Sequence, residues 1–211
     1  QAKAPYAPLE TKASYHQSWI QKKKDVEQLH TCIAFEGLER EHPLKYAMAI
    51  FNTVFGGGMS SRLFQKIREE QGLTCSIYSS AFADTGLFSI YASMNPSQAE
   101  AVYKGIAAEI AALRKEGISE KILNVTKEQM ISNFIIGSES TLNRMTAAGS
   151  AMLLRGKVQE MEEVIEKIEA VTQKDLTEVA ELVFANPKMS YSAVGNLKGV
   201  DFANTVEKLF S

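Results

Sequence analysis

The chain has 211 residues, of which 45% are hydrophobic and 23% are charged, and both values are ordinary for a globular domain. Its 23 Lys and Arg nearly balance 25 Asp and Glu, so the formal net charge is only −2. No strong positive field is available to hold a nucleic acid or an anionic membrane surface, so we expect neither as a partner. The longest strongly apolar run, residues 46–55, is too short to span a bilayer, which needs about 20 residues.

The two cysteines, Cys32 and Cys75, have neither the C-x-x-C spacing nor the neighbouring histidines of a metal site. Because nothing marks the chain for secretion, we expect free thiols and a location in the cytoplasm or an organelle matrix. The first residue is Gln1 rather than Met, so the chain is expected to be a piece of a longer protein.

The N-terminal segment differs from the rest in composition. Residues 1–12 contain two prolines and are predicted to form a linker or an extended lead-in. Strands are predicted at residues 13–20 and 28–35, with a lysine-rich turn between them. Nothing later in the chain resembles a linker, so residues 13–211 are predicted to form a single domain.

A helix is predicted at residues 44–55, because apolar side chains recur there at three-to-four spacing. The run Gly56, Gly57 and Gly58 should end it. Three successive glycines exceed what a helix end requires, and they permit close approach of another backbone. The run is therefore also a candidate for peptide or partner contact.

A second helix is predicted at residues 61–71, immediately after the glycine run. Ser60 is expected to cap it, because a serine oxygen can accept from the first free N–H groups of a helix. Leu63, Phe64 and Ile67 are expected to share its buried face.

Helices dominate the stretch from residue 97 to about residue 184. The first is predicted at 97–116 and should end at Gly117, and the next is predicted at 119–136 with Ser119 as its cap. Two or three further helices should complete this block.

A hairpin is predicted from strands at 74–82 and 87–95, and a strand at 188–196 precedes a short helix at 201–210. The order of strands, helices, hairpin, helical block and final strand predicts an α+β fold. We expect a mixed or antiparallel sheet with helices packed on one face.

A zinc site of the inverted peptidase type requires H-x-x-E-H on a helix, because residues at i and i+4 present two imidazoles on one face. The three histidines, His16, His30 and His42, fall on two predicted strands and a loop. His30 is best interpreted as a partly exposed strand residue. No metal site, cofactor or catalytic residue is therefore predicted in this chain.

The string FNTVFGGGMSSRLFQKIREEQGLTCSIYSSAF, residues 51–82, resembles the C-terminal half-module of pitrilysin/insulinase-type zinc metallopeptidases. A helix ends in a Gly-rich turn, S-S-R-L-F begins the next helix, and R-E-x-x-G-L leads into a hairpin strand. The likeness extends from about residue 12 to residue 197 and points to the mitochondrial-processing-peptidase-like subfamily. It implies one α+β half-module whose zinc-bearing domain lies outside this chain.

The resemblance also implies which residues contact substrate. In the family the first domain carries the zinc motif, and the second carries an arginine followed seven positions later by a tyrosine, which hold the substrate backbone. The corresponding positions here are Arg68 and Cys75, so a thiol replaces the family's phenol. Tyr78 is offset by three and should face the opposite side of its strand. Gly56, Gly57 and Gly58 complete the implied substrate-contact set.

Arg68 has an alternative, purely structural interpretation as a surface helix residue paired with Glu69, Glu70 or Asp84. Arg62, at the start of the same helix, is a second candidate for such structural pairing.

The resemblance implies that this chain is the non-catalytic half of a zinc-dependent endopeptidase and is inactive alone. It would hold an extended peptide against a zinc ion bound by another domain or subunit. Edge-strand pairing gives such binding affinity with little dependence on sequence. The alternative is a non-catalytic partner subunit or scaffold related to these peptidases, which the replacement at Cys75 favours.

Overall fold

A computed structural model describes residues 13–185, 188–197 and 202–210. The predicted lead-in at residues 1–12 lies outside these ranges. The strands are β1 (Trp19–Lys23), β2 (Leu29–Glu36), β3 (Ser76–Phe82), β4 (Leu87–Met94) and β5 (Met189–Gly195). The helices are α1 (Lys45–Phe55), α2 (Ala99–Glu116), α3 (Glu120–Glu139), α4 (Thr141–Arg155), α5 (Met161–Glu169), α6 (Gln173–Phe184) and α7 (Phe202–Phe210), with short helical turns η1 (Phe64–Glu69) and η2 (Pro96–Gln98).

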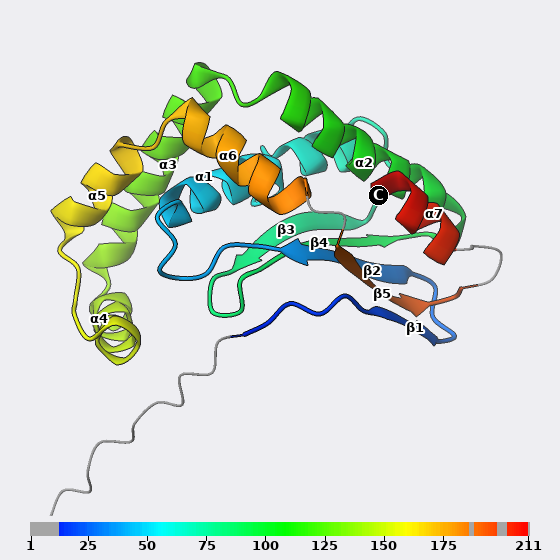
Figure 1. The fold of residues 1–211 in the computed structure, drawn as a ribbon, viewed down its shortest axis with the longest axis horizontal. Coiled ribbons are helices and arrows are strands. Elements are labelled where there is room, and N and C mark those ends of the chain that lie inside the picture. Colours follow the sequence, from blue (N-terminus) through cyan, green and yellow to red (C-terminus); the bar gives the residue numbers. More distant parts are fainter. Residues whose placement is uncertain (1–12, 186–187, 198–201, 211) are drawn as a thin grey trace, which may run out of the picture.

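The five strands form one mixed sheet in the order β1-β5-β2-β4-β3. β1 runs parallel to β5, and the other neighbours are antiparallel. Figure 1 shows α1, α2 and α6 gathered over one face of this sheet. The predicted α+β class, the mixed sheet and the one-sided helical layer are confirmed.

Alternation of buried and half-buried residues along β5 shows which face of the sheet the helices cover. In β5, Met189, Tyr191 and Ala193 are buried, whereas Ser190 and Ser192 between them are partly exposed. Successive strand residues point to opposite faces, so the apolar set meets the helices and the serines lie on the open face.

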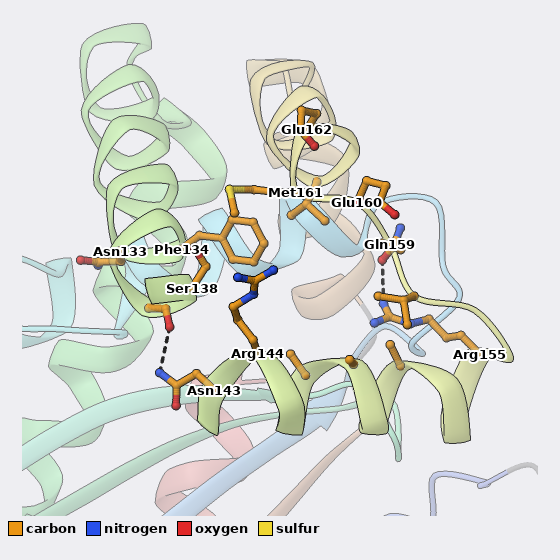
Figure 2. Close-up of a pocket in the computed structure, with 16 residues that line it drawn as sticks. Asn133, Phe134, Ser138, Asn143, Arg144, Arg155, Gln159, Glu160, Met161 and Glu162 are labelled. Atoms are coloured by element: carbon orange, nitrogen blue, oxygen red, sulfur yellow. Dashed lines mark hydrogen bonds between the residues drawn. The ribbon is translucent and has the colours of Figure 1, made fainter. Parts of the chain in front are cut away.

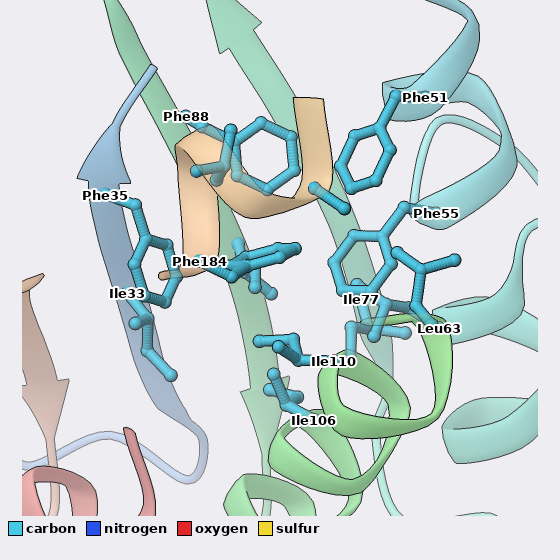
Figure 3. Close-up of a cluster of buried hydrophobic side chains, with 14 of the residues drawn as sticks. Ile33, Phe35, Phe51, Phe55, Leu63, Ile77, Phe88, Ile106, Ile110 and Phe184 are labelled. Atoms are coloured by element: carbon cyan, nitrogen blue, oxygen red, sulfur yellow. The ribbon is translucent and has the colours of Figure 1, made fainter. Parts of the chain in front are cut away.

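A cluster of phenylalanines joins the sheet to its helical layer (Figure 3). Phe51 and Phe55 of α1 stack with ring centroids 5.9 Å apart, one helical turn from each other. Phe184, at the end of α6, lies 5.5 Å from Phe55 and meets Phe88 of β4 edge-on at 5.8 Å. These separations suit favourable aromatic packing, so the cluster fixes α1 and α6 against the centre of the sheet.

The first strand begins later than predicted. β1 spans Trp19–Lys23 and includes two of the lysines assigned to a turn, whereas residues 13–18 form no strand. Its position depends on parallel pairing with β5, in which Trp19 faces Tyr191 and Lys23 faces Gly195. Lysines suit this place because β1 is a sheet edge, where charged side chains discourage pairing with other chains.

The helical block agrees with the sequence prediction. α2 ends at Gly117, whose φ of 70° suits glycine, and Ser119 caps α3 by accepting from the amide of Ile122. Three further helices follow before β5. Among the residues that the structure describes, no helix has both the length and the apolar character that crossing a membrane requires.

Candidate functional site

Arg68 lies on η1, where the helix widens into a π turn. The amide of Glu70 donates to the carbonyl of Gln65, five residues earlier, at 2.9 Å. Leu63 and Ile67 are fully buried beneath this turn. π turns are rare and frequently occur at functional sites, so the local backbone is consistent with a special role for Arg68.

Two sequence predictions for this helix were wrong. The amide of Gln65 donates to the carbonyl of Ser61, so helical bonding starts there, and Ser60 does not cap the helix. Phe64 is only partly buried, whereas Leu63 and Ile67 are fully buried.

Phe64 instead supports Arg68. The Arg68 guanidinium carbon lies 4.6 Å from the centre of the Phe64 ring, within the range of a cation–π contact. Nε of Arg68 is 3.9 Å from the nearest Glu69 carboxylate oxygen, and 43% of the arginine side chain is exposed. Sequence analysis missed this role of Phe64, although its four-residue spacing from Arg68 signals a contact across one helical turn.

The other proposed structural partners of Arg68 are engaged elsewhere. Glu70 pairs with Lys66 at 2.8 Å, and Asp84 pairs with Arg40. The ion pair with Glu69 is long and exposed and therefore contributes little to stability. Arg68 thus keeps a solvent-facing guanidinium that is free to bind another group.

Arg62, unlike Arg68, has a structural role. Its Nε donates to Glu109 Oε2 at 3.0 Å, and both side chains are mostly buried. This ion pair ties the start of the η1 segment to α2, as the sequence analysis proposed.

Cys75 is exposed and lies immediately before β3. Gln28 Nε2 donates to its sulfur at 3.3 Å, and its own amide donates to the carbonyl of Ser93 at 2.9 Å. Gly72, with φ of 62°, ends the π turn and donates to the carbonyl of Arg68. A short, fixed connection therefore joins Arg68 to Cys75, and both side chains reach solvent.

Tyr78 lies on the open face of β3. It is partly exposed and stacks on Tyr91 of β4 with centroids 4.9 Å apart, whereas its neighbours Ile77 and Ser79 are buried. Tyr91 in turn lies 2.7 Å from Nδ1 of His30, and burial raises the pKa of its phenol. Tyr78 therefore belongs to an aromatic array on the open sheet face.

The histidines do not form a metal site. His30 is partly buried on β2, His16 contacts Ser14, and His42 accepts the amide of Leu44. In the described ranges no three His, Cys, Asp or Glu side chains are placed to hold a metal ion. The donor set of these residues does not fit zinc.

The glycine run contacts the edge strand of the same chain. A Cβ at position 56 would lie 2.5 Å from the amide nitrogen of Ser79, and that amide donates to the Gly56 carbonyl at 3.0 Å. A Cβ at Gly57 would lie 2.7 Å from Cα of Thr53, whereas Gly58 has open space around it. At Gly56 the missing side chain lets β3 of the same chain pack closely against the backbone. Of the three glycines, only Gly58 has open space that a ligand could occupy.

We predict that Gly56→Ala destabilises the chain and that Gly58→Ala does not. The φ of −152° at Gly56 is open to any residue, so the cost is steric and is expected to reach about 1–3 kcal/mol. Gly58→Ala should change the free energy of unfolding by less than about 0.5 kcal/mol. Urea denaturation of both variants measures the difference. Equal midpoints would show that α1 and β3 can separate without cost.

Three comparisons identify relatives of this chain. A family model described as the peptidase M16 inactive domain matches residues 1–130. An uncharacterized zinc protease of Bacillus subtilis, YmxG, is 37% identical over 186 residues, which are 87% of this chain and 45% of that protein. An uncharacterized zinc protease of Streptomyces coelicolor, SCO5738, is 36% identical over 177 residues, which are 83% of this chain and 38% of that protein. The chain thus spans less than half the length of these relatives.

Solved structures show the same fold. A peptidase M16 inactive domain from Pseudomonas fluorescens aligns with a TM-score of 0.74 at 21% identity, over 85% of this chain and 44% of that one. A chain of complex III from Candida albicans aligns with a TM-score of 0.76 at 20% identity, over 93% of this chain and 50% of that one. At these identities the likeness concerns the fold alone.

Proposed function

Because the chain belongs to the peptidase M16 family and matches its inactive domain, we propose that it is the non-catalytic half of a zinc-dependent endopeptidase. Its role is to hold an extended peptide against a zinc ion bound by another domain of the same family. The observation that carries this proposal is the placement of Arg68, exposed and without a close carboxylate partner on a π turn beside edge strand β3.

Arg68 would act by donating to the peptide backbone. A guanidinium presents several N–H donors in a fixed plane, and a charge-assisted hydrogen bond to a carbonyl is stronger than a neutral one. Phe64 beneath the guanidinium limits its motion and so lowers the cost of ordering it. Cys75, at the other end of the short segment that follows Arg68, would contact the same peptide through its thiol, which is a weaker hydrogen-bond donor.

Zinc and the attacking water would be supplied by the other domain, because the described residues offer no suitable ligand set. Relatives described as zinc proteases are more than twice as long as the matched region, which leaves length for such a domain. We place the whole protein in the mitochondrial-processing-peptidase-like subfamily, in the cytoplasm or an organelle matrix, where its free thiols Cys32 and Cys75 would persist.

The outer face of α4 supports pairing with that zinc-bearing domain. Leu142, Met145 and Met152 lie there at helical spacing and are 58–65% exposed, and the neighbouring Leu153 is 87% exposed. Contiguous apolar surface on a soluble protein usually marks an interaction site. The part of the relatives that this chain does not match would supply the domain that covers this face.

A scaffold without peptidase activity is the second candidate. It is favoured by Cys75, which removes the phenol implied for substrate binding. The fold shared with a complex III chain is compatible with this role.

We predict that the isolated chain binds no stoichiometric zinc and cleaves no peptide, whereas mixing it with a zinc-bearing M16 domain produces cleavage. Metal analysis after dialysis against zinc and a fluorogenic peptide assay test both statements. One tightly bound zinc per chain, lost together with activity on chelation, would show that this chain itself carries the catalytic metal and would contradict the proposal.

We predict that Arg68→Ala in the assembled enzyme lowers kcat/KM and leaves the melting temperature unchanged. Losing one charge-assisted hydrogen bond costs about 1.5–3 kcal/mol, which is about ten- to a hundredfold in rate. Arg62→Ala is the matched control, because it breaks the buried pair with Glu109 and should lower the melting temperature with normal kinetics. The reverse pattern would make Arg68 a structural residue.

We predict that Cys75→Tyr folds normally and raises kcat/KM several-fold in the assembled enzyme. The position is exposed, so the ring need not enter the core. One hydrogen bond from a phenol, of about 1 kcal/mol, gives about a fivefold gain. Cys75→Phe adds the ring without the hydroxyl and should give no gain. Equal kinetics for the two variants would favour the scaffold function.

A further inference from the structure

Helices α3, α4 and α5 lie at the end of the molecule beyond the sheet (Figure 1). Residues of these helices and of the loop before α5 line a cleft there (Figure 2). Its volume is about 640 Å³, within the range of pockets that bind small ligands and short peptide segments. α3 contacts both α4 and α5, so it holds together the helices that line the cleft. Its apolar lining includes Phe134, Val158 and Met161.

The inner face of α4 forms one wall of this cleft. Arg144, Ala147, Ala148, Ala151 and Arg155 recur there at three- and four-residue spacing, which places them on one side of the helix. The three alanines leave room between the two arginines. The α4 helix therefore presents small side chains and two cations to the cleft, while its larger apolar side chains face outward.

Arg144 has no partner for its guanidinium among the residues that the structure describes. Figure 2 shows its side chain rising from α4 into the cleft towards Phe134. The positions one helical turn away are Ser140, Thr141, Ala147 and Ala148, so no carboxylate on α4 can neutralise it. This absence of an acidic neighbour is the signal by which the sequence could have marked Arg144.

Arg155 is the second cation of the cleft and is only partly satisfied. Its Nη1 donates to Gln159 Oε1 at 2.8 Å, but its Nε is buried without a hydrogen-bond partner in the described part of the chain. A buried donor without a partner costs free energy, so the cleft would gain stability from an added acceptor. Glu160 and Glu162 belong to the α5 wall, and neither forms an ion pair with the two arginines.

We propose that this cleft binds a short peptide segment that carries a carboxylate beside an apolar side chain. The carboxylate would accept from Arg144, and the apolar side chain would pack against Phe134 and Met161. Charge complementarity selects an anionic peptide, because an uncharged apolar ligand would leave the Arg144 guanidinium desolvated and unpaired. This proposal does not depend on the proposed peptidase function.

Fluorescence anisotropy tests the proposed peptide binding. It measures how tightly fluorescein-labelled peptides bind to the purified chain. The acidic probe is Ala-Leu-Glu-Phe-Ala with an amidated C-terminus, and the neutral probe has Gln in place of Glu. A third probe is the Gln peptide with a free C-terminal carboxylate. We expect the Glu probe to bind about tenfold more tightly than the neutral probe, and added salt to weaken this preference. If only the third probe binds more tightly, the carboxylate recognised is a chain terminus.

Variants of the chain assign the preference to the cleft. Arg144→Gln should remove the discrimination between Glu and Gln probes, and Ala147→Trp should fill the cleft and weaken both. Lys121→Gln removes an exposed cation on α3 that does not line the cleft and should leave all affinities unchanged. Circular dichroism melts establish that each variant is folded.

Three outcomes would overturn the proposal. The first is equal affinity of the unmodified chain for all three probes, which requires no variant. The second is discrimination that survives in Arg144→Gln. The third is no binding of any probe to the unmodified, folded chain.

Discussion

The phenylalanine cluster around Phe55 is the contact on which the candidate site depends. It fixes α1 against β4 and α6, and α1 in turn carries the glycine run to the edge of the sheet. There the Gly56 carbonyl accepts the amide of Ser79, and the Ser79 hydroxyl donates to Asn52 Oδ1 at 2.8 Å. One end of the core therefore determines where β3 lies, and with it the position of Cys75 immediately before the strand.

The contacts between α1, the glycine run and β3 also provide hydrogen-bond partners for polar groups of Ser79, which an edge strand would otherwise leave unpaired. Ser79 is buried, and its backbone and side chain are both bonded to the last turn of α1 and the glycine that follows it. A larger residue at Gly56 would keep these partners apart. Part of the outer edge of β3 is thus already occupied, which limits a peptide to the portion of the strand nearer Cys75 or the portion nearer Phe82.

Features that depend on neighbours in sequence were predictable, and those that depend on distant pairing were not. The end of α2 at Gly117 and the Ser119 cap follow from local chemistry. The start of β1 depends on β5, about 170 residues later, so the local pattern placed it wrongly. Arg68 and Cys75 could be located only by resemblance, and the π turn has no signature that spacing alone reveals. The lack of acidic neighbours could have marked Arg144, but its cleft depends on packing between α4 and distant helices.

The two thiols differ in exposure, so an alkylating reagent should modify one cysteine in preference to the other. Cys32 is partly buried on β2, and burial raises the pKa of its thiol, so its reactive thiolate is scarce. Cys75 is exposed immediately before β3. A spectroscopic label or a photocrosslinker can therefore be attached at Cys75, seven residues after Arg68, without removing any native residue elsewhere. Distances measured from that single point would map the approach of a second domain to this edge of the sheet.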